Sequence, residues 1–353
     1  MDLSSIPPYG LASAAKREFL GGQLQQLLDW HRAHCEPYAR VLDRLWSPSP
    51  VAPSLEDLPF LPVRLFKEME LLSVPHSDIV KTMTSSGTGG KLSRIFLDKA
   101  TAALQIKVLA KIMADFIGPQ RLPMLVIDSR STVSDRLKFS ARTAGILGFS
   151  MFGREVEFAL DDDMQLNLPR VMRFLEKYPD GPILLFGFTF MVWQHLVLAL
   201  EDQAQHLPLE RGVLIHGGGW KQMLAQAVDA PVFKARLAQV AGLRRVHNYY
   251  GMVEQTGSIF MECEAGQLHA SSYSELIIRD PHDFSALGPG KTGLIEVLSV
   301  IPRSYPGHIL LSEDLGEWGG EDDCPCGRMG RHFKVHGRIQ QAEVRGCSDT
   351  YTR

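Results

Sequence analysis

The segment at residues 84–91 carries residue types that bind phosphate. It reads TSSGTGGK, which places hydroxyl groups, glycines and one lysine within eight residues. Glycines let backbone N–H groups approach an anion, hydroxyl groups donate hydrogen bonds to it, and the lysine adds a positive charge. The spacing differs from that of a Walker A motif. The segment is therefore either a phosphate loop of another kind or a flexible connection between strands.

Three cysteines and one histidine form a second group with chemical potential. Cys263 and His269 are spaced C-x5-H, and Cys324 and Cys326 form a C-x-C turn. Three thiolates and one imidazole make a closed tetrahedral set for a structural zinc ion. The sequence therefore predicts a structural zinc site. The alternative is a set of buried free cysteines with His269 at the surface.

Strands and helices that could position these groups alternate through the middle of the chain. The predicted strands are short apolar runs at 123–127, 183–187, 212–216 and 245–249. The predicted helices lie at 100–117, 135–147, 190–204 and 221–240. Such alternation predicts an α/β fold with a largely parallel, helix-covered sheet.

The two ends of the chain have different patterns of apolar residues. Residues 11–46 show the apolar spacing of helices, and residues 59–75 form an extended apolar stretch with prolines. After about residue 265, short apolar runs separated by Gly, Pro and Asp predict a small β-rich region; they lie at 275–278, 293–300, 308–311 and 333–336. We therefore expect a helical region with an α/β core over residues 1–265 and a β-rich subdomain over residues 266–353.

The composition of the 353-residue chain is that of an ordinary globular protein. It is 45% hydrophobic and 22% charged, which excludes a disordered or fibrous chain. A net charge of −3 gives no basic footprint for nucleic acid. The N-terminus does not read as a signal peptide, and no apolar run is long enough to span a membrane. The 5 cysteines suit a reducing compartment, so we expect a cytoplasmic protein.

The 84–91 segment resembles the phosphate loop of the adenylate-forming enzymes, the superfamily of acyl-CoA synthetases, luciferases and peptide-synthetase adenylation domains. The resemblance implies the large N-terminal domain of that superfamily, with ATP and Mg²⁺ as cofactors. It also implies which residues hold the phosphates of ATP: Thr84, Ser85, Ser86, Gly87, Thr88, Gly89 and Lys91.

Two further motifs resemble the adenine-binding elements of the same superfamily. HGGGW at 216–220 resembles its Gly-rich turn, so Gly217, Gly218 and Gly219 are expected against the adenine. NYYGMVEQ at 248–255 resembles its N-x-Y-G-x-T-E motif. This implies nucleotide contacts from Asn248, Tyr249, Tyr250 and Gly251. Glu254 would hold Mg²⁺, whereas Val253 replaces the threonine that normally contacts the α-phosphate.

Two motifs near the end of the chain complete the resemblance. SEDLG at 312–316 resembles the T-G-D-L element, which implies that Asp314 binds the ribose hydroxyls. Gly337 and Arg338 resemble a G-R pair, which implies Arg338 near the ribose or phosphates. Only 15 residues follow Arg338. The mobile C-terminal subdomain of the superfamily, with its catalytic lysine, is therefore expected to be absent.

One branch of the superfamily fits this arrangement. The stretch LPVRLFKEMEL at 61–71 and the tail at 337–349 resemble the LuxE-type acyl-protein synthetases. In that family an adenylated carboxylic acid moves to a cysteine near the C-terminus, and a partner acyl reductase then takes the acyl group. The match places the acyl-accepting thiol at Cys347. A thiolate attacks a mixed anhydride readily, and the resulting thioester stays activated for reduction.

The acid itself is expected to lie between the sheet and its helices. The resemblance implies a wall formed by Phe186, Gly187, Phe188 and Phe190, and the aromatic content of this stretch indicates an apolar acid. Apolar residues at such spacing are also typical of a plain core, so the chain length of the acid stays open. Catalytic roles are expected for Cys347, Lys91 and Glu254.

Two other functions remain open from the sequence alone. A phenylacetate-type coenzyme A ligase would need the missing C-terminal half from another chain. A nucleotide-binding scaffold without catalysis would account for Val253 and for the absent lysine. Transfer of the acyl group to free coenzyme A, or ATP binding without pyrophosphate release, would identify these two alternatives.

Overall fold

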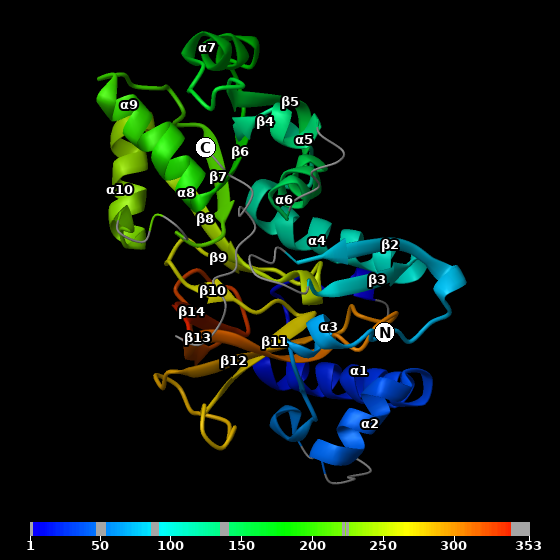
Figure 1. Cartoon of the computed structure of the whole chain (residues 1–353). Coiled ribbons are helices and arrows are strands. Elements are labelled where there is room, and N and C mark those ends of the chain that lie inside the picture. Colours follow the sequence, from blue (N-terminus) through cyan, green and yellow to red (C-terminus); the bar gives the residue numbers. More distant parts are fainter. Residues whose placement is uncertain are drawn as a thin grey trace. The chain divides into compact units, whose positions relative to one another are not determined.

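Residues 122–250 alternate between strands and helices and form an all-parallel sheet (Figure 1). The computed structural model describes residues 3–46, 54–85, 92–134, 141–220, 223 and 226–339. The chain folds into two units: the first comprises Met1–Asp115 and Gly251–Glu343, and the second is built around Phe116–Tyr250. The domain boundary expected at residue 265 stays a prediction.

The sheet of the second unit has the strand order β8-β7-β6-β4-β5, and every neighbouring pair is parallel. Its strands are β4 (Leu122–Ser129), β5 (Gly153–Leu160), β6 (Ile183–Phe188), β7 (Gly212–Gly217) and β8 (Arg245–Tyr250). β4, β6 and β7 are buried at every position, as parallel strands covered on both faces should be. Four of the strands match the predicted runs, whereas β5 was not predicted.

Helices lie on both sides of this sheet, with α6 on one side and α8 and α10 on the other (Figure 1). They are α5 (Ser131–Ser134), α6 (Ala141–Ser150), α7 (Leu168–Lys177), α8 (Thr189–Val192), α9 (Ala199–Asp202) and α10 (Ala230–Ala241). A π-helical turn, Trp193–Leu198, joins α8 to α9.

Two predicted helices have different bounds in the structure. The helix expected at 221–240 is wrong over residues 226–229, because the Asp229 side chain accepts a hydrogen bond from the Val232 N–H and a proline occupies the first turn. Because of these two features, α10 begins at Ala230. Residues 221, 222, 224 and 225 of that prediction lie outside the described residues. The helix expected at 135–147 appears as α6, and residues 135–140 lie outside the described residues.

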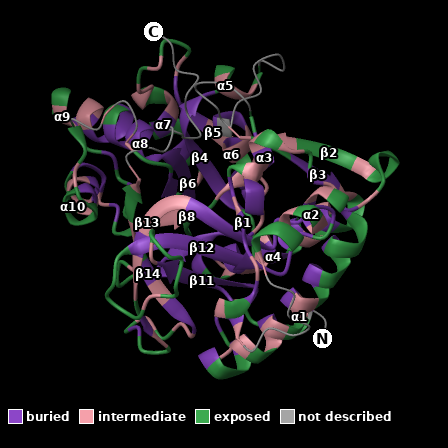
Figure 2. Ribbon diagram, turned by 60° about the horizontal axis from the view of Figure 1, so that its bottom comes forward, coloured by how far each residue is buried: buried purple, intermediate pink, exposed green. Residues whose placement is uncertain are grey.

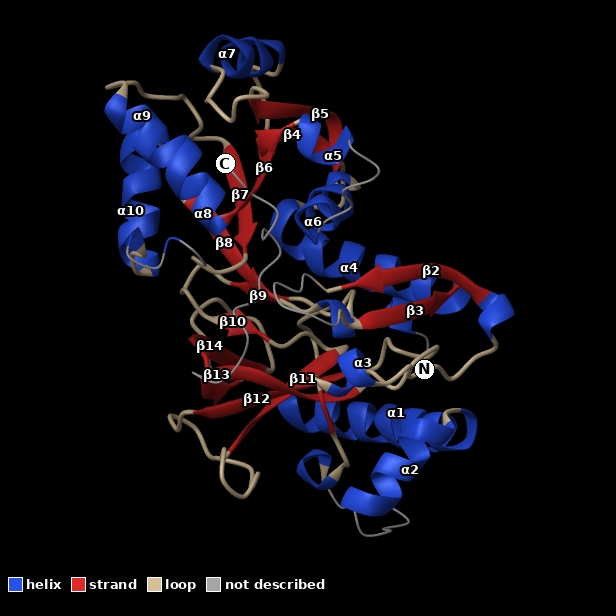
Figure 3. Cartoon of the chain, viewed as in Figure 1, coloured by secondary structure: helices blue, strands red, loops and turns tan. Residues whose placement is uncertain are grey.

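The first unit contains an antiparallel sheet of order β11-β12-β13-β14-β10-β9, with β1 paired parallel to β13. Its strands are β1 (Leu61–Pro62), β9 (Phe260–Glu262), β10 (Leu268–His269), β11 (Ser274–Arg279), β12 (Gly293–Ser299), β13 (Ile309–Glu321) and β14 (Arg331–Arg338). Figure 3 labels β9 to β14, and Figure 2 labels β1. β11 and β12 are buried along their whole length (Figure 2). The β-rich region expected after residue 265 is present.

The remaining elements of the first unit come from the N-terminal part of the chain. The helical stretch expected at 11–46 consists of two helices, α1 (Ser13–His34) and α2 (Glu36–Leu45), which meet at Cys35 just before a proline. The other elements are α3 (Leu65–Glu68), the antiparallel ribbon β2 (Ile79–Thr84) with β3 (Arg94–Asp98), and α4 (Lys99–Ile117). In the part of the chain that the structure describes, no helix has both the length and the apolar character to cross a bilayer.

Candidate active site and metal centre

The HGGGW and NYYG motifs of the second unit end two neighbouring parallel strands. The pairing of β7 with β8 sets His216 opposite Asn248 and Gly217 opposite Tyr249. Ligands of open α/β sheets bind outside the carboxyl ends of the strands. The structure therefore brings together the two motifs that the sequence relates to adenine.

The glycine turn and Tyr249 are in close contact. A Cβ atom on Gly217 would lie 2.4 Å from the Tyr249 ring, so a side chain there would displace the ring. Gly218 has a φ of 77°, which glycine adopts without strain. On the α6 side, Phe149 packs against Tyr249 with ring centroids 5.0 Å apart. Backbone and aromatic ring thus form one surface at the end of the sheet.

The aromatic residues expected to line the acid pocket are core residues of β6 and α8. Phe186 stacks on Phe149 with ring centroids 4.5 Å apart, and Phe188 contacts Phe186 edge-on. A Cβ atom on Gly187 would lie on the other face of the sheet, 2.7 Å from the Val192 side chain of α8. Packing accounts for all these contacts, and the acid-binding role of Phe186, Gly187, Phe188 and Phe190 stays a prediction.

In the first unit, Glu254 lies in the 3-10 turn Val253–Gln255, where Glu254 and Gln255 are buried. The amide of Gln255 donates hydrogen bonds to the carbonyls of Val297 and Gly307, each at 3.0 Å. A Cβ atom on Gly307 would lie 2.7 Å from the Glu254 carbonyl oxygen, which explains the glycine. The backbone at Glu254 is therefore held in place by its neighbours, and its role as a Mg²⁺ ligand stays a prediction.

Asp314 and Arg338 come from different motifs and contact each other in the first unit. They lie opposite one another on β13 and β14, and Arg338 Nε donates to Asp314 Oδ1 at 3.0 Å. Asp314 also receives local support, because its own N–H donates to Ser312 Oγ at 3.1 Å. The two residues that the resemblance places near the ribose are thus adjacent.

Thr84 ends β2, and Ser85 closes the base of the β2–β3 hairpin. The Ser85 N–H donates to the Ser93 carbonyl, and the Ser93 N–H donates to Ser85 Oγ at 3.0 Å. The rest of the expected phosphate loop, Ser86, Gly87, Thr88, Gly89 and Lys91, lies outside the described residues, as does Cys347.

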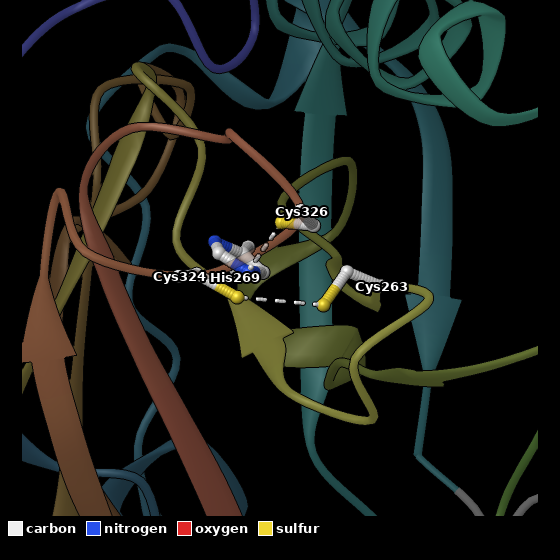
Figure 4. Close-up of side chains that lie close together, drawn as sticks. All are labelled: Cys263, His269, Cys324 and Cys326. Atoms are coloured by element: carbon white, nitrogen blue, oxygen red, sulfur yellow. Dashed lines mark hydrogen bonds between the residues drawn. The ribbon is translucent and has the colours of Figure 1, made fainter.

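The four predicted metal ligands lie together in the first unit (Figure 4). Their ligand atoms are all within 4.8 Å of one another. Cys263 Sγ is 3.8 Å from Cys324 Sγ, and Cys326 Sγ is 3.4 Å from His269 Nε2. With zinc–ligand bonds of about 2.3 Å to sulfur and about 2.0 Å to nitrogen, tetrahedral geometry gives edges of about 3.8 and 3.5 Å. The donor set and both edges fit a zinc ion.

Strand pairing explains how residues distant in sequence reach this cluster. His269 lies on β10, which pairs with β9 on one side and with β14 on the other. Cys263 directly follows β9, and the turn with Cys324 and Cys326 lies between β13 and β14. Cys263, His269 and Cys324 are buried, whereas Cys326 is half-buried.

The N-terminal arm, residues 6–16, packs against this cluster of cysteines and His269. The Tyr9 ring meets the His269 ring edge-on, and the Arg328 guanidinium lies 5.6 Å from the centre of the Tyr9 ring. Asp322 accepts hydrogen bonds from the N–H groups of both Ser13 and Gly330. The loop that carries two of the cysteines is therefore connected to the start of α1.

Comparison with known proteins identifies similar chains. The family described as "Acyl-protein synthetase, LuxE" matches residues 3–353. A long-chain-fatty-acid–luciferin-component ligase of Aliivibrio fischeri is 24% identical over 272 residues, which are 74% of this chain and 70% of the relative. One of Vibrio harveyi is 22% identical over 333 residues, 90% of this chain and 83% of the relative.

Two solved structures show the same fold. An open conformation of 2-hydroxyisobutyryl-CoA ligase with 2-HIB-AMP and CoA superimposes with a TM-score of 0.73 at 18% identity, over 95% of this chain and 77% of that one. ATP-bound MatB from Rhodopseudomonas palustris gives a TM-score of 0.50 at 14% identity, over 76% and 49%. The expected fold of an adenylate-forming N-terminal domain is confirmed.

Proposed function

The chain belongs to the LuxE family of acyl-protein synthetases, and from this premise we propose that it activates a long-chain fatty acid with ATP and transfers the acyl group to its own Cys347. Ligase activity follows from the family. The acid, the transfer to Cys347 and the site residues are the proposal. Both relatives are named as ligases of long-chain fatty acids, which supports the choice of acid.

The first half-reaction forms a mixed anhydride. A carboxylate oxygen of the acid attacks the α-phosphorus of ATP, and the bond to the β-phosphate breaks to release pyrophosphate. Lys91 and the hydroxyls and glycine amides of residues 84–89 bind the phosphates. Mg²⁺, held by Glu254, would neutralise phosphate charge. Asp314 accepts hydrogen bonds from the ribose hydroxyls, with Arg338 beside it.

The observation that carries this proposal is the contact between the glycine turn and Tyr249. The HGGGW and NYYG motifs are far apart along the chain, yet they lie at the ends of two paired parallel strands and contact each other. That edge of the sheet is where such folds bind ligands. Only glycine at 217 permits that contact. A turn and aromatic ring in this position suit the adenine of ATP, and the adjacency of Asp314 and Arg338 suits its ribose.

The second half-reaction transfers the acyl group. The Cys347 thiolate attacks the carbonyl carbon of the acyl-AMP, the bond from that carbon to the phosphate oxygen breaks, and AMP leaves. A thioester near the end of the chain can then be delivered to an acyl reductase or another acyl-accepting protein. A cytoplasmic location remains the prediction from the sequence.

We also propose that Cys263, His269, Cys324 and Cys326 bind a structural zinc ion. Zinc would connect β9, β10 and the turn before β14 as a closed four-ligand centre, with no open position for catalysis. Metal analysis of the purified protein should give about one zinc per chain. Cys263→Ser should lower that content sharply, and Cys35→Ser, which changes a buried cysteine outside the cluster, should not.

Acid-dependent exchange of labelled pyrophosphate into ATP tests adenylation separately from acyl transfer. We expect exchange that requires a long-chain acid, survives in Cys347→Ala and falls at least about tenfold in Glu254→Gln. Glu36→Gln, which changes a carboxylate 81% exposed on α2, is the matched control. No exchange with any acid, despite ATP binding, would contradict adenylation and favour the scaffold. Exchange together with thioester formation on free coenzyme A would favour the ligase of the phenylacetate type.

A further inference from the structure

Thr189 contacts the glycine turn from the side opposite to Tyr249. It is the first residue of α8 and follows β6 directly. Its Oγ1 donates a hydrogen bond to the Gly217 carbonyl at 3.2 Å and lies 2.9 Å from His216 Nδ1. Both side chains are buried, with Thr189 6% and His216 5% exposed.

The protons of this group can be assigned from its chemistry. A threonine hydroxyl has one proton, and a carbonyl oxygen can only accept, so the Thr189 proton goes to Gly217. His216 Nδ1 must then carry the proton that it shares with Thr189 Oγ1. Burial lowers the pKa of His216 to about 3, so the ring is neutral at pH 7. The result is a chain of two hydrogen bonds: His216 donates to Thr189, and Thr189 donates to the Gly217 carbonyl.

This chain fixes the orientation of the peptide between Gly217 and Gly218. In a trans peptide the N–H points away from the C=O, so anchoring the Gly217 carbonyl at Thr189 directs the Gly218 N–H to the other side. The Tyr249 ring restrains the turn from the α6 side, and a Cβ atom on Gly218 would lie 3.1 Å from the Phe188 ring. The turn is thus supported on both faces, and Thr189 supports it through a hydrogen bond of its side chain.

His216 is itself held in place by packing on the α10 side. Its ring lies 4.8 Å from that of Phe233, which belongs to α10. Trp193 of the π-helical turn stacks on the same phenylalanine, with ring centroids 6.0 Å apart. An imidazole in such a setting keeps one orientation, which is what a donor to Thr189 requires.

We propose that Thr189, oriented by His216, is a positioning residue that presets the Gly217–Gly219 turn for the adenine of ATP. The inference rests on the proposed adenine-binding role of that turn. It predicts a selective effect. Without the Thr189 hydroxyl the turn is less ordered before binding, so ordering it costs binding free energy and the affinity for the nucleotide falls. Binding of the acid and the chemical step should change little.

The test compares Thr189→Val, which keeps the shape and removes the hydroxyl, with Thr189→Ser, which retains it. AMP binding by calorimetry and the KM values for ATP and for the acid are measured on each full-length protein. For Thr189→Val we expect the Kd for AMP and the KM for ATP to rise about tenfold, the loss typical of one buried hydrogen bond. We expect KM for the acid and kcat to stay within about twofold, and Thr189→Ser to restore AMP affinity.

A second pair of variants tests the role of His216. The side-chain amide of His216→Asn can donate to Thr189 much as Nδ1 does, whereas His216→Leu cannot. Asparagine should therefore be closer to the wild type than leucine in AMP affinity. If Thr189→Val fails to fold, the difference in AMP affinity between His216→Asn and His216→Leu still tests the inference.

Two results would overturn the inference: equal rises in both KM values, or an unchanged AMP affinity in both Thr189→Val and His216→Leu. Failure of the proposed function would look different. In that case the wild type itself would lack acid-dependent pyrophosphate exchange or AMP binding, whatever the variants do.

Discussion

The buried ion pair between Lys16 and Glu275 gives a stability prediction whose size follows from the structure. Lys16 Nζ lies 3.1 Å from Glu275 Oε2, and the two side chains are 1% and 2% exposed. Lys16 also donates to the Ala270 carbonyl at 3.0 Å. In Lys16→Met the Glu275 carboxylate stays buried and loses its counter-ion. Breaking a buried pair in this way costs about 3–5 kcal/mol. Because the Leu276 N–H still donates to Glu275 Oε1, we expect the lower end, about 3 kcal/mol.

The double variant Lys16→Met with Glu275→Leu separates the charge from the packing. It removes both charges, so the main remaining losses are the donor to the Ala270 carbonyl and the acceptor for the Leu276 N–H, each of which costs about 1 kcal/mol. The double variant should therefore be more stable than Lys16→Met alone. Unfolding in urea, followed for the transition that includes α1, gives the free energies.

An exposed pair provides the control. Arg40 and Glu36 on α2 lie 3.8 Å apart and are 69% and 81% exposed. Arg40→Met should change the free energy of unfolding by less than about 0.5 kcal/mol. If Lys16→Met is no more destabilising than Arg40→Met, or if the losses at Lys16 and Glu275 simply add, the reasoning about the buried pair is refuted.

Three further predictions concern pH, metal and the glycine turn. Burial lowers the pKa of His31 to about 3 and that of His308 well below 6.5, so the unfolded state binds more protons below pH 6.5. Urea unfolding at a series of pH values should show full stability above pH 6.5 and a loss of up to about 1.4 kcal/mol per histidine per pH unit below it. A chelator that removes the proposed zinc ion should speed proteolysis within residues 6–16, because the arm packs on its proposed ligands. Gly217→Ala should weaken AMP binding at least about tenfold in calorimetry, because the added methyl group displaces the Tyr249 ring.

Each of these three predictions has an outcome that would contradict it. Stability that stays constant between pH 6.5 and 4 would mean that the two histidines become protonated without unfolding. Equal rates of proteolysis with and without chelator would mean that metal binding does not hold residues 6–16 in place. Gly148→Ala on α6, where nothing lies within 4 Å of the added methyl group, is the control for Gly217→Ala. Equal AMP affinity in the two variants would contradict the contact with Tyr249.

The sequence predicted the central strands because their apolar runs are uninterrupted. β5 was missed for a physical reason: Arg154, Glu155 and Glu157 interrupt its pattern, which an edge strand with solvent on one side tolerates. Residues 226–229 of the helix expected at 221–240 are not α-helical because the Asp229 side chain caps the helix after them, and apolar spacing alone does not indicate a cap. Local signals thus sufficed for buried elements and failed at edges and ends.

The grouping of three cysteines and one histidine was predictable because two short spacings, C-x5-H and C-x-C, together offer the ligand set of a structural zinc site. That they meet depends on the pairing of β10 with both β9 and β14, which no local pattern reveals. Thr189 shows the limit of sequence reasoning. A threonine after an apolar strand has no distinctive signal, and its contact with His216 exists only because β6 and β7 pair in one particular register.

The most direct test of the account is the mass of the intact protein after incubation with ATP, Mg²⁺ and a long-chain fatty acid. We predict a gain equal to one acyl group, lost on treatment with hydroxylamine, which cleaves thioesters. Cys347→Ala should show no adduct while still releasing pyrophosphate in an acid-dependent reaction. An adduct that persists in Cys347→Ala, or no adduct in the wild type although pyrophosphate is released, would contradict transfer to this cysteine.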